Sequence, residues 1–219
     1  MRNNSFDNVP ESIVGRLASY HRCLKNAASN GQTVIKSSDI SKLCGIKATV
    51  VRKDLTHFGE FGIKGKGYNI ITLSSNIEEI MGLNTEKKVI LIGAGNLGTA
   101  LLKYPGFSGA NFKFLAAFDI GAEIIGTSIN SVPILHIDKL GAFLKSNEVQ
   151  IAILTVPSQE AETIASQLHN CSIKGILNFT SAILKSDDGK FYIRNIDLSK
   201  ELEVISFCMK KCLKNKEEK

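Results

Sequence analysis

Three glycines, Gly93, Gly95 and Gly98, follow directly after the apolar run KKVILI in the segment KKVILIGAGNLG. A GxGxxG spacing at the end of a strand and the start of a helix lets backbone N–H groups approach the pyrophosphate of a dinucleotide. Taken alone, this glycine pattern is weak evidence for a dinucleotide site. Asp119 strengthens it, because an acidic residue about 20 positions further on binds the hydroxyls of the adenosine ribose. The pattern therefore predicts a dinucleotide site.

The carboxylate of Asp119 also bears on which dinucleotide binds. Its negative charge repels the 2′-phosphate of NADP(H), which favours NAD(H). The alternative role for this residue is a helix cap or a turn. Together with the segments that follow two later strands, the predicted cofactor contacts are Gly93, Ala94, Gly95, Asn96, Leu97, Gly98, Asp119, Thr155, Val156, Pro157, Asn178 and Phe179.

The predicted site lacks a group suited to proton transfer. A dehydrogenase needs such a group beside its cofactor, usually together with a substrate domain. The chain has four histidines, and we expect none of them at a strand end that faces the cofactor. His136 is expected in a surface loop after Pro133, and His169 at the end of a helix, whereas His21 and His57 lie in the first part of the chain. We therefore predict no catalytic residues.

A glycine loop of this kind connects a buried strand to a helix, so further strands and helices are expected to alternate after it. Continuous apolar runs indicate strands that are buried on both faces. Strands are predicted at KKVILIGA, NFKFLAAFD, QIAILTVP and KGILNF, and helices at IDKLGAFLKS and SQEAETIASQLH. This alternation predicts an α/β fold with a doubly wound parallel sheet of the Rossmann type.

The first part of the chain is predicted to be mostly helical. Helices are expected from Pro10 to about Asn30, from an N-cap at Ser38, and over TVVRKDLTHFGEFG, where Gly59 or Gly62 ends the helix. The segment FGIKGKGYNIITL then indicates a short hairpin with a basic tip before a β-branched run. Three helices with a tight turn before the third, followed by a hairpin, predict a winged helix-turn-helix.

The third helix and the hairpin carry residues suited to DNA. The major groove admits one helix, base-edge readers project from its first turns, and cations meet the phosphates. The alternative is a helical protein-interaction domain whose basic residues are only solvated. The predicted DNA contacts are Thr49, Arg52, Lys53, Lys64, Gly65 and Lys66.

Composition and charge agree with two small domains. The chain has 219 residues, 43% hydrophobic content and a net charge of +6. Residues 1–82 carry 11 Lys and Arg against 7 Asp and Glu, which suits a polyanionic partner or an ordinary solvated surface. The polar start MRNNSFDNVP and the lack of a run of about 18 apolar residues predict a cytoplasmic protein.

The cysteines show no metal-binding pattern. The five of them form no CxxC pair and no Cys/His set with zinc-ligand spacing, so no metal is expected. Ordinary thiols are one interpretation. A redox pair is the other, because Cys208 and Cys212 lie one helical turn apart.

Several motifs together resemble the Rex family of redox-sensing transcriptional repressors over about residues 9–209. They are VPESIVGRLASY, VRKDLTHFGEFG, KGKGY, GAGNLG, LAAFD, LTVP, KGILNF and NIDLSKEL. The chain departs from many members at Val50, Lys64, Thr180 and Ser181. The resemblance implies a homodimeric repressor that binds operator DNA when the NADH/NAD+ ratio is low and is released by NADH. NADH and NAD+ are then effectors. The alternative function is a small NAD- or CoA-binding Rossmann enzyme with an accessory helical domain.

The resemblance also divides the chain. It implies a winged-helix DNA-binding domain with its linker at residues 1–82, a Rossmann NAD(H)-binding domain at 83–198, and an exchanged dimerisation helix with a basic tail at 199–219. Helical spacing places one apolar stripe on this last segment, and packing of that stripe onto its own domain is the alternative to exchange. The stripe consists of Leu202, Ile205, Cys208, Met209 and Cys212.

Three residues match a family constellation that couples the domains: Arg16, Tyr104 and Asp197. By this resemblance Tyr104 also belongs to the cofactor site. Asp197 of the partner subunit is expected to pair with Arg16 in one state and with Tyr104 in the other. From the residues alone, Arg16 is a surface cation, Tyr104 a packing residue and Asp197 the N-terminal cap of the last helix.

Overall fold

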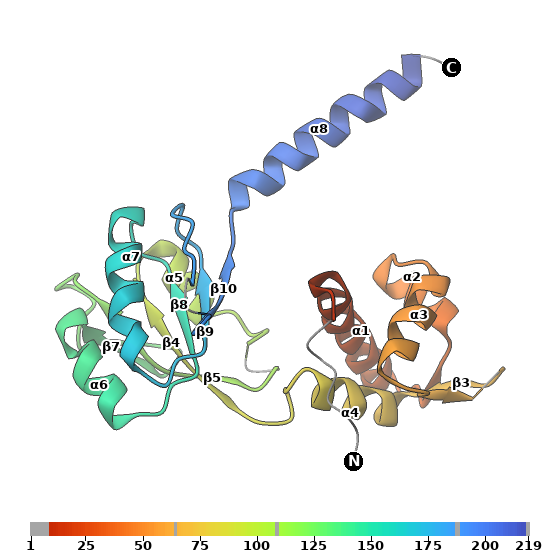
Figure 1. Cartoon of the computed structure of the whole chain (residues 1–219), viewed down its shortest axis with the longest axis horizontal. Helices are drawn as coiled ribbons and strands as arrows, with labels where there is room; N and C mark the ends of the chain where they lie inside the picture. The colour runs from red at the N-terminus through yellow and green to blue at the C-terminus, as the bar shows by residue number, and fades with distance from the viewer. Residues whose placement is uncertain (1–8, 64, 108–109, 187–188, 218–219) are drawn as a thin grey trace. The chain divides into compact units, whose positions relative to one another are not determined.

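The computed structural model of the chain describes residues 9–63, 65–107, 110–186 and 189–217, without the side chains of residues 170 and 211–217. Two compact units are present, Met1–Thr85 and Glu86–Lys219 (Figure 1). Each unit has a hydrophobic core of its own. None of the helices in the described part of the chain has the length and apolarity that a membrane crossing needs.

The first unit combines helices with a small antiparallel sheet. Its helices are α1 (Glu11–Ser29), α2 (Ser37–Cys44), α3 (Ala48–Phe58) and α4 (Ile70–Ile80). The sheet has the order β1-β3-β2 and consists of β1 (Val34–Ile35), β2 (Gly62–Ile63) and β3 (Gly67–Asn69). The helices meet in a core formed by Leu17, Tyr20, Leu24, Ala27, Ile35, Ile40, Val51, Leu55, Ile70, Leu73 and Ile77.

Glycines produce the tight connections of this unit. Gly45 ends α2 in the left-handed region at φ 68°, so α3 begins only three residues later. Gly65 and Gly67 have φ of 82° and 95° in the β2–β3 hairpin. A Cβ on Gly67 would lie 2.6 Å from the carbonyl oxygen of Ile35, so the pairing of β1 with β3 requires glycine.

One local prediction for this unit was wrong. Helix α2 begins at Ser37 and not after Ser38, because the Asp39 carboxylate accepts the Lys36 N–H at 3.0 Å and places the N-cap at Lys36, two residues earlier. The β-branched run after the hairpin is the first turn of α4. Asn69 caps that helix by accepting the N–H of Thr72 at 3.0 Å.

The second unit is built on a sheet with the strand order β10-β9-β8-β4-β5-β7-β6. Its pairs are parallel except that β6 and β7 are antiparallel. The strands are β4 (Lys87–Ile92), β5 (Phe112–Asp119), β6 (Ser128–Ile129), β7 (Val132–His136), β8 (Ile151–Leu154), β9 (Gly175–Asn178) and β10 (Tyr192–Asn195). The strand order reverses between β4 and β8, where doubly wound sheets bind ligands at the carboxyl ends of the strands.

Helices cover both faces of this sheet (Figure 1). Ile90 and Ile92 of β4 pack in one core with α6 (Leu140–Ser146) and α7 (Ser158–Gln167). Val89 and Leu91 point to the other face, where they share a core with Leu102 of α5 (Asn96–Leu102). The short 3-10 helices η3 (Ile137–Lys139) and η4 (Leu168–Asn170) flank α6 and α7. The chain ends in α8 (Leu198–Glu217), whose residues 198–210 are all exposed.

The predicted strands β4, β5, β8 and β9 are confirmed, but β6, β7 and β10 were missed. The expectation of a surface loop at His136 was therefore wrong. This residue ends β7 and is the register partner of Asp119 at the end of β5. Pro133 does not interrupt β7 because it lies at the second position, where the partner is the short strand β6.

Candidate functional site

Gly93 and Gly98 are required by close backbone approach. Gly93 has φ of 97°, and a Cβ on it would lie 2.7 Å from the carbonyl oxygen of Thr155. A Cβ on Gly98 would collide with the carbonyl oxygen of Gly93. The two glycines therefore let the β4–α5 turn close against itself and against the end of β8.

The space in front of the loop is open. A Cβ on Gly95 would meet no atom within 4 Å, although Gly95 directly precedes the first turn of α5. Asn96 and Leu97 form that first turn and are exposed, and Ala94 is buried behind it. An open approach to a glycine at a helix start is the geometry that a phosphate group needs.

Asp119 ties the loop to the end of β5. Its Oδ2 accepts the N–H of Ala94 at 2.5 Å, and its Oδ1 accepts the N–H groups of Ile120 and Gly121 at 2.8 Å. The carboxylate therefore already orders the glycine loop, and Oδ2, which accepts one N–H where Oδ1 accepts two, keeps a lone pair for a ribose hydroxyl.

Glu123 is a second carboxylate at this end of the sheet that the sequence analysis missed. A Cβ on Gly121 would lie 2.8 Å from Oε1 of Glu123 and 3.3 Å from Oδ1 of Asp119, so both acids face the same glycine. His136 ends the neighbouring strand, and its Nδ1 lies 3.1 Å from Oδ2 of Asp138. The presence of an acid four residues after Asp119 was the only sequence signal for Glu123.

The residues after β8 and β9 differ in what their side chains can do. The Thr155 hydroxyl donates to the carbonyl oxygen of Gly93 at 2.6 Å and so links the ends of β8 and β4. Val156 packs against the core and Pro157 precedes the first residue of α7. Phe179 packs in the core on the other face of the sheet.

The side chain of Asn178 is engaged inside the protein. It is fully buried, and its Nδ2 donates to the Ala182 carbonyl at 2.7 Å and to Oδ1 of Asn195 at 2.8 Å. Its Oδ1 accepts the N–H of Thr180 at 3.0 Å. The amide therefore holds the end of β9 to the segment after it and to β10, with both its nitrogen and its oxygen bonded inside the protein.

Tyr104 lies apart from the glycine loop. Its ring stacks edge-on against Phe107 with centroids 5.3 Å apart, and 55% of the residue is exposed. Both residues line a cavity of about 320 Å³ together with Glu86 and Phe112, which lie at the starts of β4 and β5. The structure thus brings Tyr104 to the amino ends of the strands and the other predicted cofactor contacts to the carboxyl ends.

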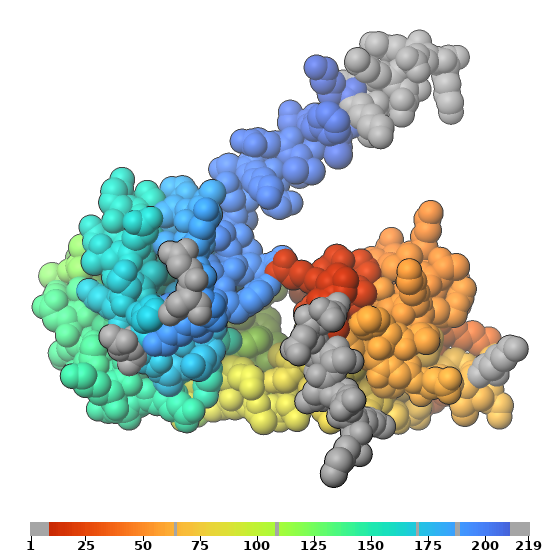
Figure 2. All heavy atoms as spheres, viewed as in Figure 1, coloured from red at the N-terminus to blue at the C-terminus, as the bar shows by residue number. Residues whose placement is uncertain are grey.

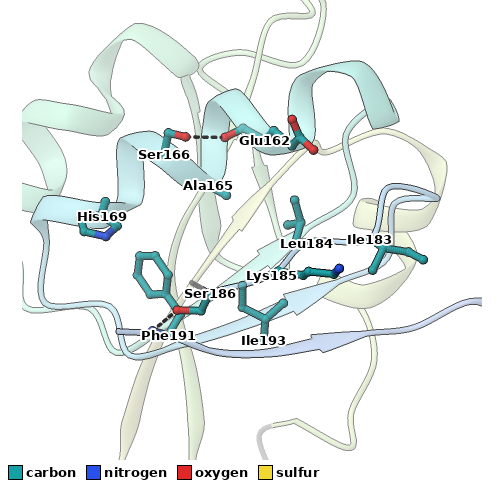
Figure 3. A pocket seen from close by; sticks show the side chains of 10 residues that line it. All are labelled: Glu162, Ala165, Ser166, His169, Ile183, Leu184, Lys185, Ser186, Phe191 and Ile193. Atoms are coloured by element: carbon teal, nitrogen blue, oxygen red, sulfur yellow. Dashed lines mark hydrogen bonds between the residues drawn. The ribbon is translucent and has the colours of Figure 1, made fainter. Parts of the chain in front are cut away.

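A cavity of about 670 Å³ lies between α7 and the strand β10 with the segment before it (Figure 3). Its labelled side chains include Glu162 and Ser166 from α7 together with Leu184 and Ile193, and the Ser166 hydroxyl donates to the carbonyl oxygen of Glu162 at 2.9 Å. No residue of the glycine loop lines it. The cavity is therefore separate from the glycine loop.

In the first unit the predicted DNA contacts form an exposed surface. Thr49, Arg52 and Lys53 are exposed on α3, which belongs with α2 to the part of the chain drawn in orange in Figure 2. Arg52 Nη1 donates to the Ser37 hydroxyl at 2.8 Å, which anchors its side chain across the start of α2. A helix that follows a tight turn and carries exposed cations is suited to insertion into the major groove of DNA.

The hairpin carries the remaining predicted contacts. Gly65 and Lys66 are exposed, and the N–H of Lys66 donates to the carbonyl oxygen of Ile63 at 3.0 Å to close the turn. Lys64 lies outside the described residues. The described tip of the hairpin therefore presents an exposed glycine and an exposed lysine beside Ile63.

Arg16 is not a simple surface cation. Its Nε and Nη2 donate to the Asp54 carboxylate at 2.6 and 2.8 Å, and the Tyr20 hydroxyl donates to the same carboxylate at 2.8 Å. Asp54 lies on α3 and is only 2% exposed. These bonds tie α1 to the helix that carries the predicted DNA contacts.

The electrostatics of this cluster favour the ion pair. Burial alone would raise the pKa of Asp54, but hydrogen bonds from Arg16 and Tyr20 outweigh it and hold that pKa below its usual value. The hydrogen bond to Asp54 raises the pKa of Arg16. Burial, followed by the bond to Asp54, raises the pKa of Tyr20. All three side chains thus stay in the bonded form at neutral pH.

Asp197 caps α8. Its Oδ1 accepts the N–H groups of Ser199 and Lys200 at 2.9 and 3.2 Å. The residue is exposed, and the cap uses only Oδ1. Oδ2 can therefore bond a second donor while the cap is kept.

Comparison with known proteins assigns both units. Residues 8–56 match the family described as putative DNA-binding protein N-terminus, and residues 84–182 match the CoA binding domain family. The redox-sensing transcriptional repressor Rex of Carboxydothermus hydrogenoformans is 41% identical over 91% of this chain and 95% of that relative. The Rex of Desulfitobacterium hafniense is 40% identical over 91% and 94%. This chain belongs to the Rex family.

Solved structures agree with this assignment. RSP, a Rex-family repressor, in complex with β-NAD+ and operator DNA has a TM-score of 0.85 at 33% identity over 95% of this chain and 96% of that one. RSP with β-NADH has a TM-score of 0.84 at 32% identity over 97% and 99%. The predicted fold, a winged helix-turn-helix followed by a Rossmann-like sheet, is confirmed. The Rex relatives are named redox-sensing transcriptional repressors.

Proposed function

We propose that this Rex-family chain is a redox-sensing transcriptional repressor that binds operator DNA when the NADH/NAD+ ratio is low and is released by NADH. The observation that carries this function is the match of nearly the whole chain to RSP, whose structures hold NAD+ with operator DNA and, separately, NADH. NADH and NAD+ act as effectors. A repressor works where the chromosome lies, so we place the protein in the cytoplasm.

The test begins with a duplex that the protein selects from a random library. Its affinity is then measured by fluorescence anisotropy while NADH, NAD+, NADPH or CoA is added. We expect NADH to release the duplex at concentrations that leave NAD+ and NADPH without effect. CoA tests the enzyme-like alternative, since the second unit matches the CoA binding domain family. Failure to select any duplex, or release by CoA alone, would contradict the proposal.

The cofactor site is proposed at the carboxyl ends of β4, β5 and β8. The open space before Gly95 supports the pyrophosphate position, and Asp119 supports the adenosine ribose position. Thr155 and Val156 follow β8 at the strand-order reversal, which suits the nicotinamide end. The proposed domains are residues 1–82, 83–198 and 199–219.

Asp119→Ala is expected to weaken NADH binding by roughly ten- to a hundredfold, because a hydrogen bond to a charged group contributes about 1.5–3 kcal/mol. The preference for NADH over NADPH should also fall, since the 2′-phosphate no longer meets a negative charge. A fluorescence titration with each cofactor measures both effects. Asp119→Asn should lose both affinity and preference as well, because it replaces one acceptor oxygen by an NH2 group that would face the N–H of Ala94 or those of Ile120 and Gly121. If Asp119→Ala keeps the preference for NADH over NADPH and Glu123→Ala loses it, the residue that repels the 2′-phosphate is Glu123.

The DNA surface is proposed to use α3 for the major groove and the hairpin for the backbone. Lys53→Ala and Lys66→Ala should each weaken binding about equally on all duplexes and reduce the salt slope by about one unit. Arg52→Ala should cost about 1–3 kcal/mol on the selected duplex and relax the preference at one base pair. Lys174→Ala, an exposed cation of the second unit, is the matched control. Equal losses for Arg52→Ala on every duplex would make it a phosphate contact.

We propose that α8 forms a homodimer by exchange between subunits. Its exposed apolar side chains support this role, because a helix that carries so many of them is too apolar to remain in water. Removal of residues 199–219 should turn the dimer into a monomer by light scattering. A dimer that survives the truncation would contradict the exchange. The side chains concerned are Leu198, Leu202, Val204, Ile205, Phe207 and Met209.

The proposed switch uses Arg16, Tyr104 and Asp197. Because Asp54 binds Arg16 to α3, we place the pairing of Arg16 with Asp197 of the partner subunit in the DNA-bound state. The pairing of Asp197 with Tyr104 belongs to the released state. Arg16 can bind a second carboxylate, because 30% of its side chain is exposed and its two bonds to Asp54 use only some of its N–H donors.

A further inference from the structure

A disulfide joins Cys23 of α1 to Cys44 at the end of α2. Their Cα atoms are 6.9 Å apart, inside the limit of about 7 Å beyond which two cysteines cannot be bridged without backbone movement. Both residues are partly exposed, so small oxidants and reductants can reach them. Among the cysteines whose side chains are described, Cys171 and Cys208 are free.

The bond lies at the centre of the helix-turn-helix. Cys44 is the last residue of α2, directly before the left-handed Gly45 that turns the chain into α3. On α1, Cys23 follows Tyr20 by one turn, and Tyr20 bonds to Asp54 of α3. The disulfide and the Asp54 cluster therefore tie α1 to both helices of the DNA-binding motif.

We propose that Cys23 and Cys44 are a reversible, oxidant-sensitive thiol pair that gives the repressor a second redox input, independent of NADH. This inference rests on the proposed function, because a repressor works beside the chromosome, in a compartment that keeps thiols reduced. Disulfides that form in such a compartment are transient and redox-sensing as a rule. The signal acts on the DNA-binding unit directly and needs no change at the cofactor site.

A hydroperoxide is the class of oxidant that the pair can use. One thiolate attacks the terminal peroxide oxygen, the O–O bond breaks, and a sulfenic acid forms while an alcohol or water leaves. The second thiolate attacks the sulfenic sulfur, the S–S bond forms, and hydroxide leaves as water. Two electrons pass from the thiols to the peroxide. A dithiol reductant restores both thiols by exchange.

The bond should strengthen DNA binding. It holds the turn between α2 and α3 against α1, so less conformational entropy is lost when α3 docks into the groove. Oxidation then acts in the same direction as a low NADH/NAD+ ratio. The cofactor affinity should not change, because both cysteines belong to the first unit.

The experiment compares the full-length protein reduced with dithiothreitol and the same protein treated with hydrogen peroxide. Peptide mapping identifies the Cys23–Cys44 bond, and anisotropy measures the affinity for the selected duplex. We expect the oxidised protein to bind at least about fivefold more tightly. Cys23→Ser and Cys44→Ser should each abolish this difference. The matched variants Cys171→Ser and Cys208→Ser should keep it.

Absence of the Cys23–Cys44 bond after peroxide treatment would overturn the proposal, as would equal or weaker duplex binding by the bonded protein. The NADH response of the reduced protein is measured in parallel. Loss of that response would count against the proposed function alone, because the comparison of oxidised with reduced protein uses no cofactor.

Discussion

Asp54→Ala is expected to destabilise the DNA-binding unit by about 1–3 kcal/mol, because the buried Tyr20 hydroxyl and the partly exposed Arg16 guanidinium lose the carboxylate that accepts their hydrogen bonds. Arg16 would lose both of its bonds to α3, and the Tyr20 hydroxyl would lose its acceptor. Hydrogen exchange of the α1 and α3 amides in the full-length protein measures this local stability. Duplex affinity should fall with it, since α3 loses its anchor to α1.

A double variant separates the lost charge pair from lost packing. Arg16→Met combined with Asp54→Leu removes both charges and keeps apolar volume, so it should lose much less stability than Asp54→Ala alone. The Tyr20 hydroxyl still lacks its acceptor there, so the recovery should be incomplete. A double variant that is as unstable as Asp54→Ala would mean that the cluster acts through packing and not through charge.

The same pair predicts how stability depends on pH. Because folding lowers the pKa of Asp54, its stabilising contribution is present above the unfolded value of about 3.9 and is lost as the pH falls through the folded value. The stability difference between the wild type and Asp54→Ala should therefore be constant at neutral pH and shrink below about pH 4. A difference that grows on acidification would contradict the direction of this shift.

The sequence predicted those parts of the fold that depend on local pattern. The strands β4, β5, β8 and β9 are continuous apolar runs. Gly93 and Gly98 stand at positions where neighbouring backbone atoms leave no room for a Cβ. The strands β6, β7 and β10 were missed because β6 has only two residues, Pro133 interrupts the apolar run of β7, and β10 includes the polar residues Arg194 and Asn195. Each depends on a neighbouring strand for its pairing, and periodicity carries no information about that neighbour.

Contacts between distant residues could not be predicted in the same way. Arg16 and Asp54 are 38 residues apart, and Cys23 and Cys44 are 21 apart, so no helical or strand spacing connects them. The role of Asn178 was also hidden, since only the fold reveals that Asn195 and Ala182 engage its amide. Sequence spacing identified residues whose side chains can bind a ligand or DNA, but it did not identify the residues that hydrogen-bond to those side chains and fix their positions.

Asp197→Asn is expected to reduce the coupling between NADH and DNA by about fivefold or more, where coupling is the ratio of duplex Kd with and without saturating NADH. Asparagine caps helices as well as aspartate does, so α8 keeps its N-terminal cap. The variant therefore removes the negative charge that Arg16 would bind and leaves the local structure in place. Anisotropy titrations with and without NADH give the ratio.

Tyr104→Phe tests the other half of the switch. The ring keeps its edge-on contact with Phe107, and only the hydroxyl that Asp197 of the partner subunit would bond is lost. Release by NADH should then need a higher concentration, while duplex binding without cofactor stays normal. The affinity for NADH itself, measured without DNA, is the control in both variants. If both variants keep the wild-type ratio, the switch lies in other residues, because each removes one of the two pairings without disturbing the helix cap or the ring packing.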